Sequence, residues 1–110
     1  MTTKQDYDEI LTRLTVILTR LNNGENLVVK DLAEEFNVVT RTIQRDFNER
    51  LTSFPIILEN KKWKMKGDFK IDNPDTIENI LILDMLEKTS QNLGDKFFVK
   101  AQKLLKQITI

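Results

Sequence analysis

Residues 30–51, with the sequence KDLAEEFNVVTRTIQRDFNERL, decide the fold. The first part predicts a short helix over residues 31–36, and a break follows over residues 37–39. Asn37 tolerates the left-handed conformation in which helices often end. A second helix is expected over residues 40–51, because its apolar side chains recur every four positions and therefore share one face. These apolar residues are Ile43, Phe47 and Leu51.

The other faces of this second helix carry polar side chains, most of which are long and able to donate hydrogen bonds. Arginine can bind guanine through two hydrogen bonds and glutamine can bind adenine in the same way, which makes Arg41 and Gln44 candidates for base reading. A helix with such a face, held by a short preceding helix and a tight turn, fits the major groove of DNA. An ordinary solvated face is the alternative. The candidate DNA-contacting residues are Thr40, Arg41, Thr42, Gln44, Arg45 and Asn48.

Composition limits the classes of function. A chain of 110 residues with 40% hydrophobic content forms one domain, or a small domain with an appendage. It has no cysteine and no histidine, which removes disulfides, nearly all zinc or iron sites and the usual general base. Without a glycine-rich phosphate loop either, we expect no enzyme, no catalytic residue, no metal and no cofactor. No apolar run approaches the roughly eighteen residues of a membrane span and the N-terminus is polar, so a cytoplasmic location is expected.

The net charge is zero, but the charge is unevenly distributed. Residues 1–39 hold four Lys or Arg against seven Asp or Glu, a net of −3. Residues 40–70 hold eight against four, a net of +4, and residues 71–110 hold five against six, a net of −1. The positive charge therefore falls on the second helix and the segment after it, although a mixed-charge surface could also produce this pattern by chance.

The segments before and after this helix pair also have predictable secondary structure. An amphipathic helix is expected over residues 6–21, and residues 27–29 suit a small strand or an extended lead-in. Residues 56–59 predict a strand, and residues 62–66 predict a second strand by strict alternation, with a tight turn at residues 60–61 between them. The predicted order is one helix, a short strand, two helices and a hairpin. This is the order of elements in a winged helix-turn-helix. The predicted fold class is therefore mainly α with a small β-hairpin, the wing.

The wing is basic. Its candidate phosphate contacts are Lys61, Lys62 and Lys64, since each neutralised phosphate releases counterions and adds to salt dependence. An edge hairpin kept soluble by its lysines is the alternative. The alternation of Trp63 and Met65 with lysines favours a core position for both, although a tryptophan could also stack on a base.

A second part of the chain follows the wing. Residues 1–67 are expected to form the winged domain, residues 68–74 a linker, and residues 75–110 a helical segment. Helices are predicted over 75–89 and 95–108, and their apolar surface exceeds what a small winged domain buries. We expect it to form a homodimer interface, with packing on the same domain or on a further C-terminal domain as the alternatives. The candidate residues are Ile80, Leu83, Leu86, Phe97, Phe98, Ala101, Leu104, Leu105 and Ile108.

Residues 32–51, LAEEFNVVTRTIQRDFNERL, resemble the N-terminal winged helix-turn-helix of bacterial WYL-domain transcriptional regulators and related DeoR-type repressors. The shared pattern is Leu-Ala-Glu-Glu, a turn valine, Thr-Ile-x-Arg-Asp and a leucine. The resemblance covers roughly residues 10–67 and implies binding to double-stranded DNA. Residues 75–110 resemble the helical linker before a WYL domain, which is itself absent, so the chain is similar to a truncated or shortened member with a missing effector domain.

The sequence departs from this family pattern at Val39, where the family usually has a serine that caps the recognition helix and can touch a phosphate. Valine can do neither, and Thr40 is expected to take over the cap. In the family Arg45 and Asp46 form a fixed pair. Arg45 suits either a phosphate contact or an internal acidic partner, whereas an exposed Asp46 would repel DNA, so a structural role is favoured for it.

Two classes of function therefore remain. The first is a sequence-specific DNA-binding transcriptional regulator, with the recognition helix over about 40–51 and a basic wing over 56–66. The second is a winged helix that binds an acidic protein partner, which the zero net charge keeps open.

Overall fold

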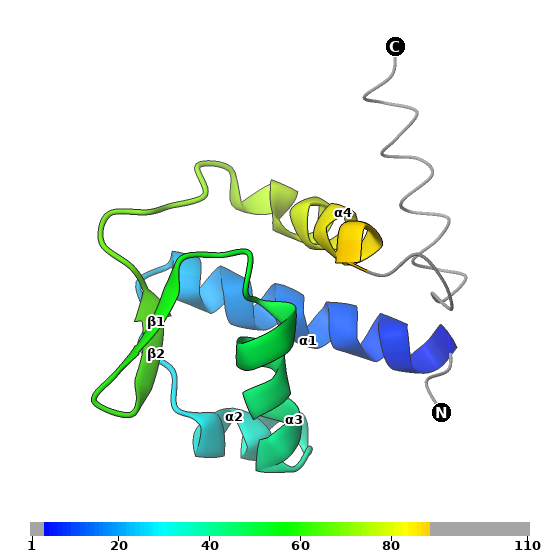
Figure 1. The fold of residues 1–110 in the computed structure, drawn as a ribbon, viewed down its shortest axis with the longest axis horizontal. Helices are drawn as coiled ribbons and strands as arrows, with labels where there is room; N and C mark the ends of the chain where they lie inside the picture. The colour runs from blue at the N-terminus through cyan, green and yellow to red at the C-terminus, as the bar shows by residue number, and fades with distance from the viewer. Residues whose placement is uncertain (1–3, 89–110) are drawn as a thin grey trace. The chain divides into compact units, whose positions relative to one another are not determined.

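Residues 4–88 are described by the computed structural model, with side chains from residue 7 onward. The chain divides into two compact units, one formed by residues 16–74 and the other by residues 1–15 and 75–110. The elements are α1 (Lys4–Asn22), α2 (Val29–Phe36), α3 (Thr40–Arg45), the π-helical turn η1 (Asp46–Arg50), β1 (Ile56–Glu59), β2 (Lys62–Met65), the 3₁₀ turn η2 (Pro74–Thr76) and α4 (Ile77–Lys88) (Figure 1). The order confirms the predicted class, mainly α with a small hairpin after the helices.

The unit of residues 16–74 has its core where the apolar faces of its helices meet. The second half of α1 supplies Ile17, Leu18 and Leu21, all fully buried. The apolar face predicted for residues 40–51 is also buried, which fixes the rotation of that helix and turns its polar face outward. The remaining buried apolar residues of this unit are Leu27, Leu32, Ala33, Ile43, Phe47, Leu51 and Ile71.

The turn between α2 and α3 follows the sequence expectation. Asn37 adopts the left-handed conformation, with φ 55°, and its N–H bonds back to Glu34 O at 3.2 Å. Val38 N–H bonds to Ala33 O at 3.0 Å, which completes the pair of bonds typical of a helix ending in a left-handed residue. The left-handed residue lets α3 start three residues after it and pack on α2 (Figure 1).

The predicted recognition helix is helical over nearly its whole length, but its second half is not α-helical. From Asp46 to Arg50 the backbone forms a π-helical turn, in which Leu51 N–H bonds to Asp46 O at 2.8 Å. Such turns contain one more residue per hydrogen-bonded loop than an α-helix. The sequence pattern did not predict this feature, because Ile43, Phe47 and Leu51 still fall on the buried face.

The hairpin has the predicted strands and turn. Ile56 pairs with Met65 and Leu58 with Trp63 across the two strands. Asn60 and Lys61 both have positive φ, 52° and 64°, the backbone of a two-residue type I′ turn. Leu27 forms an isolated antiparallel bridge to Trp63, with N–H···O distances of 2.8 and 2.7 Å in the two directions. The extended lead-in predicted for residues 27–29 thus adds one residue pair beside the wing.

The segment after the wing, expected as a linker over residues 68–74, is held by a buried contact. Ile71 is buried, and its N–H donates to Asn22 Oδ1 at 2.7 Å. Asn22 Nδ2 donates in turn to Ile71 O at 3.1 Å. Because a buried backbone group without a partner is costly, this pair of bonds fixes the segment to the end of α1.

In the other unit, α4 begins at Ile77, two residues later than the predicted start at residue 75, and it is described to Lys88. Its buried residues are Ile77, Leu81, Ile82 and Met85, whereas Ile80, Leu83 and Leu86 are half-buried. The helix predicted over residues 95–108, with its candidate interface residues, lies outside the described residues. No helix in residues 4–88 is long and apolar enough to cross a membrane.

Candidate nucleic-acid interface

The polar face of the recognition helix is open to solvent. Thr40, Arg41, Gln44, Arg45 and Asn48 are exposed, and Thr42 is half-buried. They alternate with Ile43 and Phe47, whose burial in the core anchors the helix. The structure therefore brings the candidate base-reading side chains onto one outward surface of α3 and η1. A rigid helix that presents such side chains can enter a major groove.

The expectation that Thr40 caps this helix is wrong. Val39 occupies the N-cap position, with φ −74° and ψ 156°, and no side chain caps the helix there. Thr40 is already the first helical residue, so its backbone is helical rather than in the extended conformation that lets a capping side chain fold back onto the following N–H groups. Val39 itself is 68% exposed.

The adjacent pair Arg45 and Asp46 has two separate roles. Asp46 is fully buried, and its Oδ1 accepts a hydrogen bond from Arg50 Nη1 at 2.7 Å, in agreement with the structural role predicted for it. Arg45 is exposed, and its Nε lies 3.8 Å from Glu49 Oε2. An exposed pair at that distance is weak, so the guanidinium of Arg45 can exchange Glu49 for a phosphate.

The two faces of the wing differ in chemistry. Side chains alternate across the pleat and paired residues share a face, so Leu58 and Trp63 lie on one face and Lys62 and Lys64 on the other. Lys64 is paired with Glu59 through an Nζ···Oε1 distance of 2.6 Å. Lys61 lies in the turn itself. Of the three predicted wing lysines, only Lys61 also borders the recognition helix.

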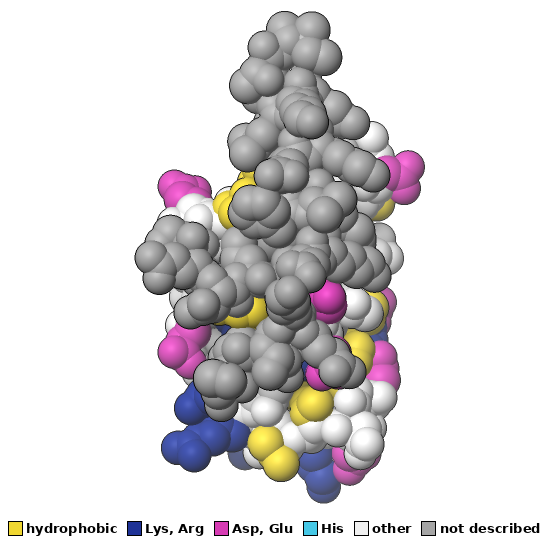
Figure 2. All heavy atoms as spheres, turned by 90° about the vertical axis from the view of Figure 1, so that its right-hand side faces the viewer, with side chains coloured by type: hydrophobic (Ala, Val, Ile, Leu, Met, Phe, Trp, Pro, Cys, Tyr) yellow, Lys and Arg dark blue, Asp and Glu magenta, His cyan; other side chains and the backbone are white. Residues whose placement is uncertain are grey.

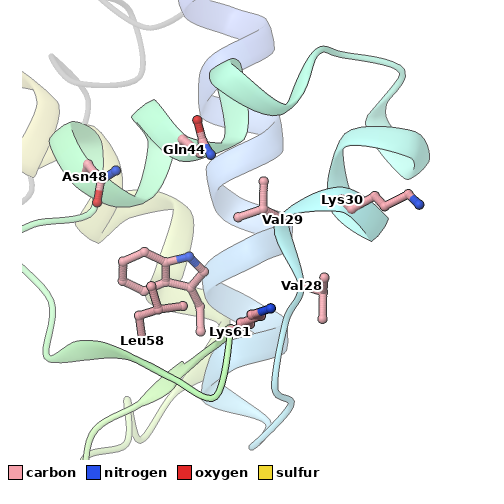
Figure 3. Close-up of a pocket in the computed structure, with 8 residues that line it drawn as sticks. Val28, Val29, Lys30, Gln44, Asn48, Leu58 and Lys61 are labelled. Atoms are coloured by element: carbon pink, nitrogen blue, oxygen red, sulfur yellow. The ribbon is translucent and has the colours of Figure 1, made fainter.

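A hollow of about 410 Å³ lies between the recognition helix and the wing. In Figure 3, Gln44 and Asn48 project from the helix on one side, and Leu58 projects from the wing on the other. The residues lining it are Val28, Val29, Lys30, Gln44, Asn48, Leu58, Lys61 and Trp63. The surface is mainly hydrocarbon, and none of these eight residues is acidic.

Trp63 lines this hollow and also contacts the core. Its ring is stacked parallel on Phe47, with ring centroids 4.5 Å apart. Phe47 is buried, whereas Trp63 is half-buried and lines the hollow. The core position predicted for Trp63 thus holds for the ring face on Phe47, while the remaining surface of the side chain is accessible.

Five of the lining residues are not among the DNA contacts predicted from the sequence: Val28, Val29, Lys30, Leu58 and Trp63, the last of which was expected in the core. For Leu58 a signal existed, because a tight turn at residues 60–61 places it opposite Trp63 and on the same face. For residues 28–30 no local pattern pointed to the interface. Their place depends on the bridge between Leu27 and Trp63, which joins segments far apart in the chain.

Two positively charged residues, Lys30 and Lys61, line the hollow. Figure 2 shows Lys and Arg side chains toward the lower end of the face in view. Lys30 and Lys61 have no ion pair within the described part of the chain, whereas Arg20 has two, to Glu25 and Glu35. The hydrogen bond to Glu25, and then the contacts with Glu35, raise the pKa of Arg20. Lys30 and Lys61 are therefore available to an anionic partner, whereas the guanidinium of Arg20 is already paired with two carboxylates.

The helix pair of α2 and α3 lies within a segment that matches a known protein family. Residues 13–57 match the DeoR-like helix-turn-helix domain. The DeoR-like match begins within α1, contains α2, α3 and η1, and ends in the first residues of the wing. It supports the predicted resemblance to the N-terminal helix-turn-helix of a DeoR-type regulator, while the WYL branch stays a prediction. Comparisons with curated proteins and with solved structures gave no match.

Proposed function

We propose that this chain is a sequence-specific transcriptional regulator that binds double-stranded DNA, with the recognition helix in the major groove and the basic wing on the backbone. The observation that carries the proposal is the outward polar face of α3 and η1 inside a DeoR-like helix-turn-helix match. The buried face of the same helix holds Arg41, Gln44 and Asn48 in one orientation, as groove reading requires.

The roles of the side chains follow from their chemistry and position. Arg41 and Gln44 read base edges, Asn48 and Thr42 reach bases or phosphates, and Arg45 contacts phosphate in place of Glu49. Thr40, the first residue of α3, is proposed as a further DNA contact at the start of the recognition helix. On the wing, Lys61, Lys62 and Lys64 supply phosphate contacts, and Lys64 must first release Glu59.

We propose further that the chain binds as a homodimer, which would read paired half-sites and double the phosphate contacts. The support is the apolar surface of α4, where Ile80, Leu83 and Leu86 remain half-buried. The predicted residues of the last helix, Phe97, Phe98, Ala101, Leu104, Leu105 and Ile108, would extend the same interface.

The test is selection of bound fragments from genomic DNA, followed by titration of a selected duplex and a scrambled duplex at two salt concentrations. Preferential binding of the selected duplex, weakened by salt for both, is the expected result. If no DNA binds at low salt, the DNA-binding proposal is wrong, and a winged helix that binds an acidic protein becomes the better explanation. Equal affinity for both duplexes would remove sequence specificity from the proposal.

A further inference from the structure

We infer that the hollow between the recognition helix and the wing holds one sugar–phosphate segment of the DNA backbone, with a deoxyribose on its apolar surface and a phosphate at Lys61. The inference rests on the proposed DNA binding and adds a backbone site to which the wing contributes Leu58, Lys61 and Trp63, all outside the matched residues 13–57. It assigns a role to Leu58 and Trp63, which otherwise leave apolar surface exposed.

The composition of the hollow fits a segment that is anionic at its ends and rich in carbon between them. Leu58, Trp63 and Val28 provide hydrocarbon surface, and the carboxamide of Asn48 can donate hydrogen bonds from the opposite side (Figure 3). No acidic side chain lines the hollow. An uncharged apolar ligand would leave the cation and the carboxamide at its rim without partners.

Lys61 is placed to meet the phosphate. It lines the hollow in the turn of the wing, and it has no ion pair within residues 4–88. In Figure 3 the amino group of Lys61 points toward the segment that carries Val28, whereas the amino group of Lys30 points away from Lys61. Lys61 is therefore the cation of the hollow, and Lys30 lies at its outer rim.

Lys61 also occupies an unusual backbone position. Its φ is 64°, and the second residue of a type I′ turn is usually glycine. A residue that violates a local rule is often kept for function. A lysine is sterically less favourable than glycine in this conformation, but it places a positive charge at the hollow.

Leu58 gives the first test, because it is 56% exposed and Phe69, also exposed at 45%, is a matched control outside the lining of the hollow. Leu58→Glu and Phe69→Glu make the same change in charge, and each replaces an exposed apolar side chain. We expect Leu58→Glu to weaken binding to selected and scrambled duplexes alike, by about tenfold, which is the effect of roughly one lost charge-assisted contact. Phe69→Glu should change affinity at most about threefold, as a distant surface charge does.

The second test locates the phosphate. Duplexes that each carry one neutral methylphosphonate are titrated with the wild-type chain, Lys61→Gln and Lys62→Gln. At one backbone position the neutral linkage should weaken the wild type and leave Lys61→Gln unchanged, since the contact is already lost. Lys62→Gln, one residue away on the other face of the wing, should still lose affinity at that position. Lys61→Gln should also reduce the salt slope by about 0.9, the value for one phosphate.

The outcomes separate the two proposals. If the chain binds DNA but Leu58→Glu and Phe69→Glu weaken it equally, the hollow does not hold the backbone, and the DNA-binding proposal stands. Additive losses for Lys61→Gln and methylphosphonate at every position would also overturn the inference. A variant is compared only when its circular dichroism spectrum and melting temperature match the wild type, and Leu58→Ser with Phe69→Ser replaces the pair if Leu58→Glu unfolds. Absence of any DNA binding overturns both proposals.

Discussion

At the scale of single residues, the recognition helix separates side chains that hold it from side chains that are available to DNA. Asp46 is buried against Arg50, although the sequence places it among exposed polar neighbours. Arg41 and Gln44 are exposed, and neither is ion-paired within the described residues. The helix formed by α3 and η1 thus contains both a structural ion pair and the proposed base-reading pair.

Arg41→Ala and Gln44→Ala are therefore expected to reduce specificity more than general affinity. Each change should cost about 1–3 kcal/mol in discrimination between the selected and scrambled duplexes. Fluorescence anisotropy titration of both duplexes measures the difference, and Glu34→Ala, which is exposed on α2, is the control. Equal losses on both duplexes would mean that the two residues contact only the backbone.

The uncapped start of α3 gives a stability prediction. Val39 has the extended backbone of an N-cap and an exposed side chain, so a serine can be placed there without strain. Val39→Ser should stabilise the chain by about 1 kcal/mol, because the hydroxyl would accept a bond from an unpartnered N–H of the first turn. Urea unfolding measures the gain. Thr40→Ser, which lies inside the helix, should give no comparable gain, and a similar gain there would argue against the capping explanation.

At the scale of elements, the sequence predicted the helices and the wing because each has a clear periodic burial pattern. The four-residue spacing of Ile43, Phe47 and Leu51 and the alternation around Trp63 required no knowledge of distant contacts. The hollow could not be predicted in the same way, since it depends on how the wing and the recognition helix are placed by the Leu27–Trp63 bridge. The helical cap was assigned to the wrong residue because caps depend on the backbone conformation of one position.

The wing turn allows stability and binding to be separated. Lys61→Gly should stabilise the hairpin by about 1 kcal/mol, since glycine adopts the left-handed conformation without the steric cost of a Cβ. The same change removes the charge at the hollow and should weaken DNA binding. Thermal melting and duplex titration of one variant measure both effects. Lys62→Gly, in a strand with ordinary backbone, should lower stability instead, and a loss of stability for both variants would contradict the explanation.

At the scale of the whole molecule, the division of charge is more informative than its sum. The segment with a net of +4 contains the recognition helix and the wing, while the acidic residues predominate before it and after it. A chain with zero net charge can therefore still present a cationic surface to a duplex. The acidic remainder should limit weak binding elsewhere on the surface.

The proposed dimer makes a prediction at the same scale. Leu83→Ser should shift the sedimentation equilibrium toward monomer and weaken binding to a duplex with two half-sites more than binding to a single half-site. Glu87→Ser, on the exposed side of α4, is the control. If the wild type sediments as a monomer across the concentration range and also on the two-site duplex, the dimer proposal is wrong.

The π-helical turn has a consequence for how the length of this chain can change. Removing one residue from an α-helix rotates everything after it by about 100°, which would move Phe47 and Leu51 off the buried face if the deletion fell in α3. Removing Glu49 instead would leave Leu51 four residues after Asp46, so that its N–H could make an ordinary α-helical bond to the same oxygen. The variant without Glu49 should therefore melt at a clearly higher temperature than the variant without Arg45. Equal melting temperatures would contradict this. The turn is then a point where relatives could gain or lose a residue while Arg41 and Gln44 keep their orientation.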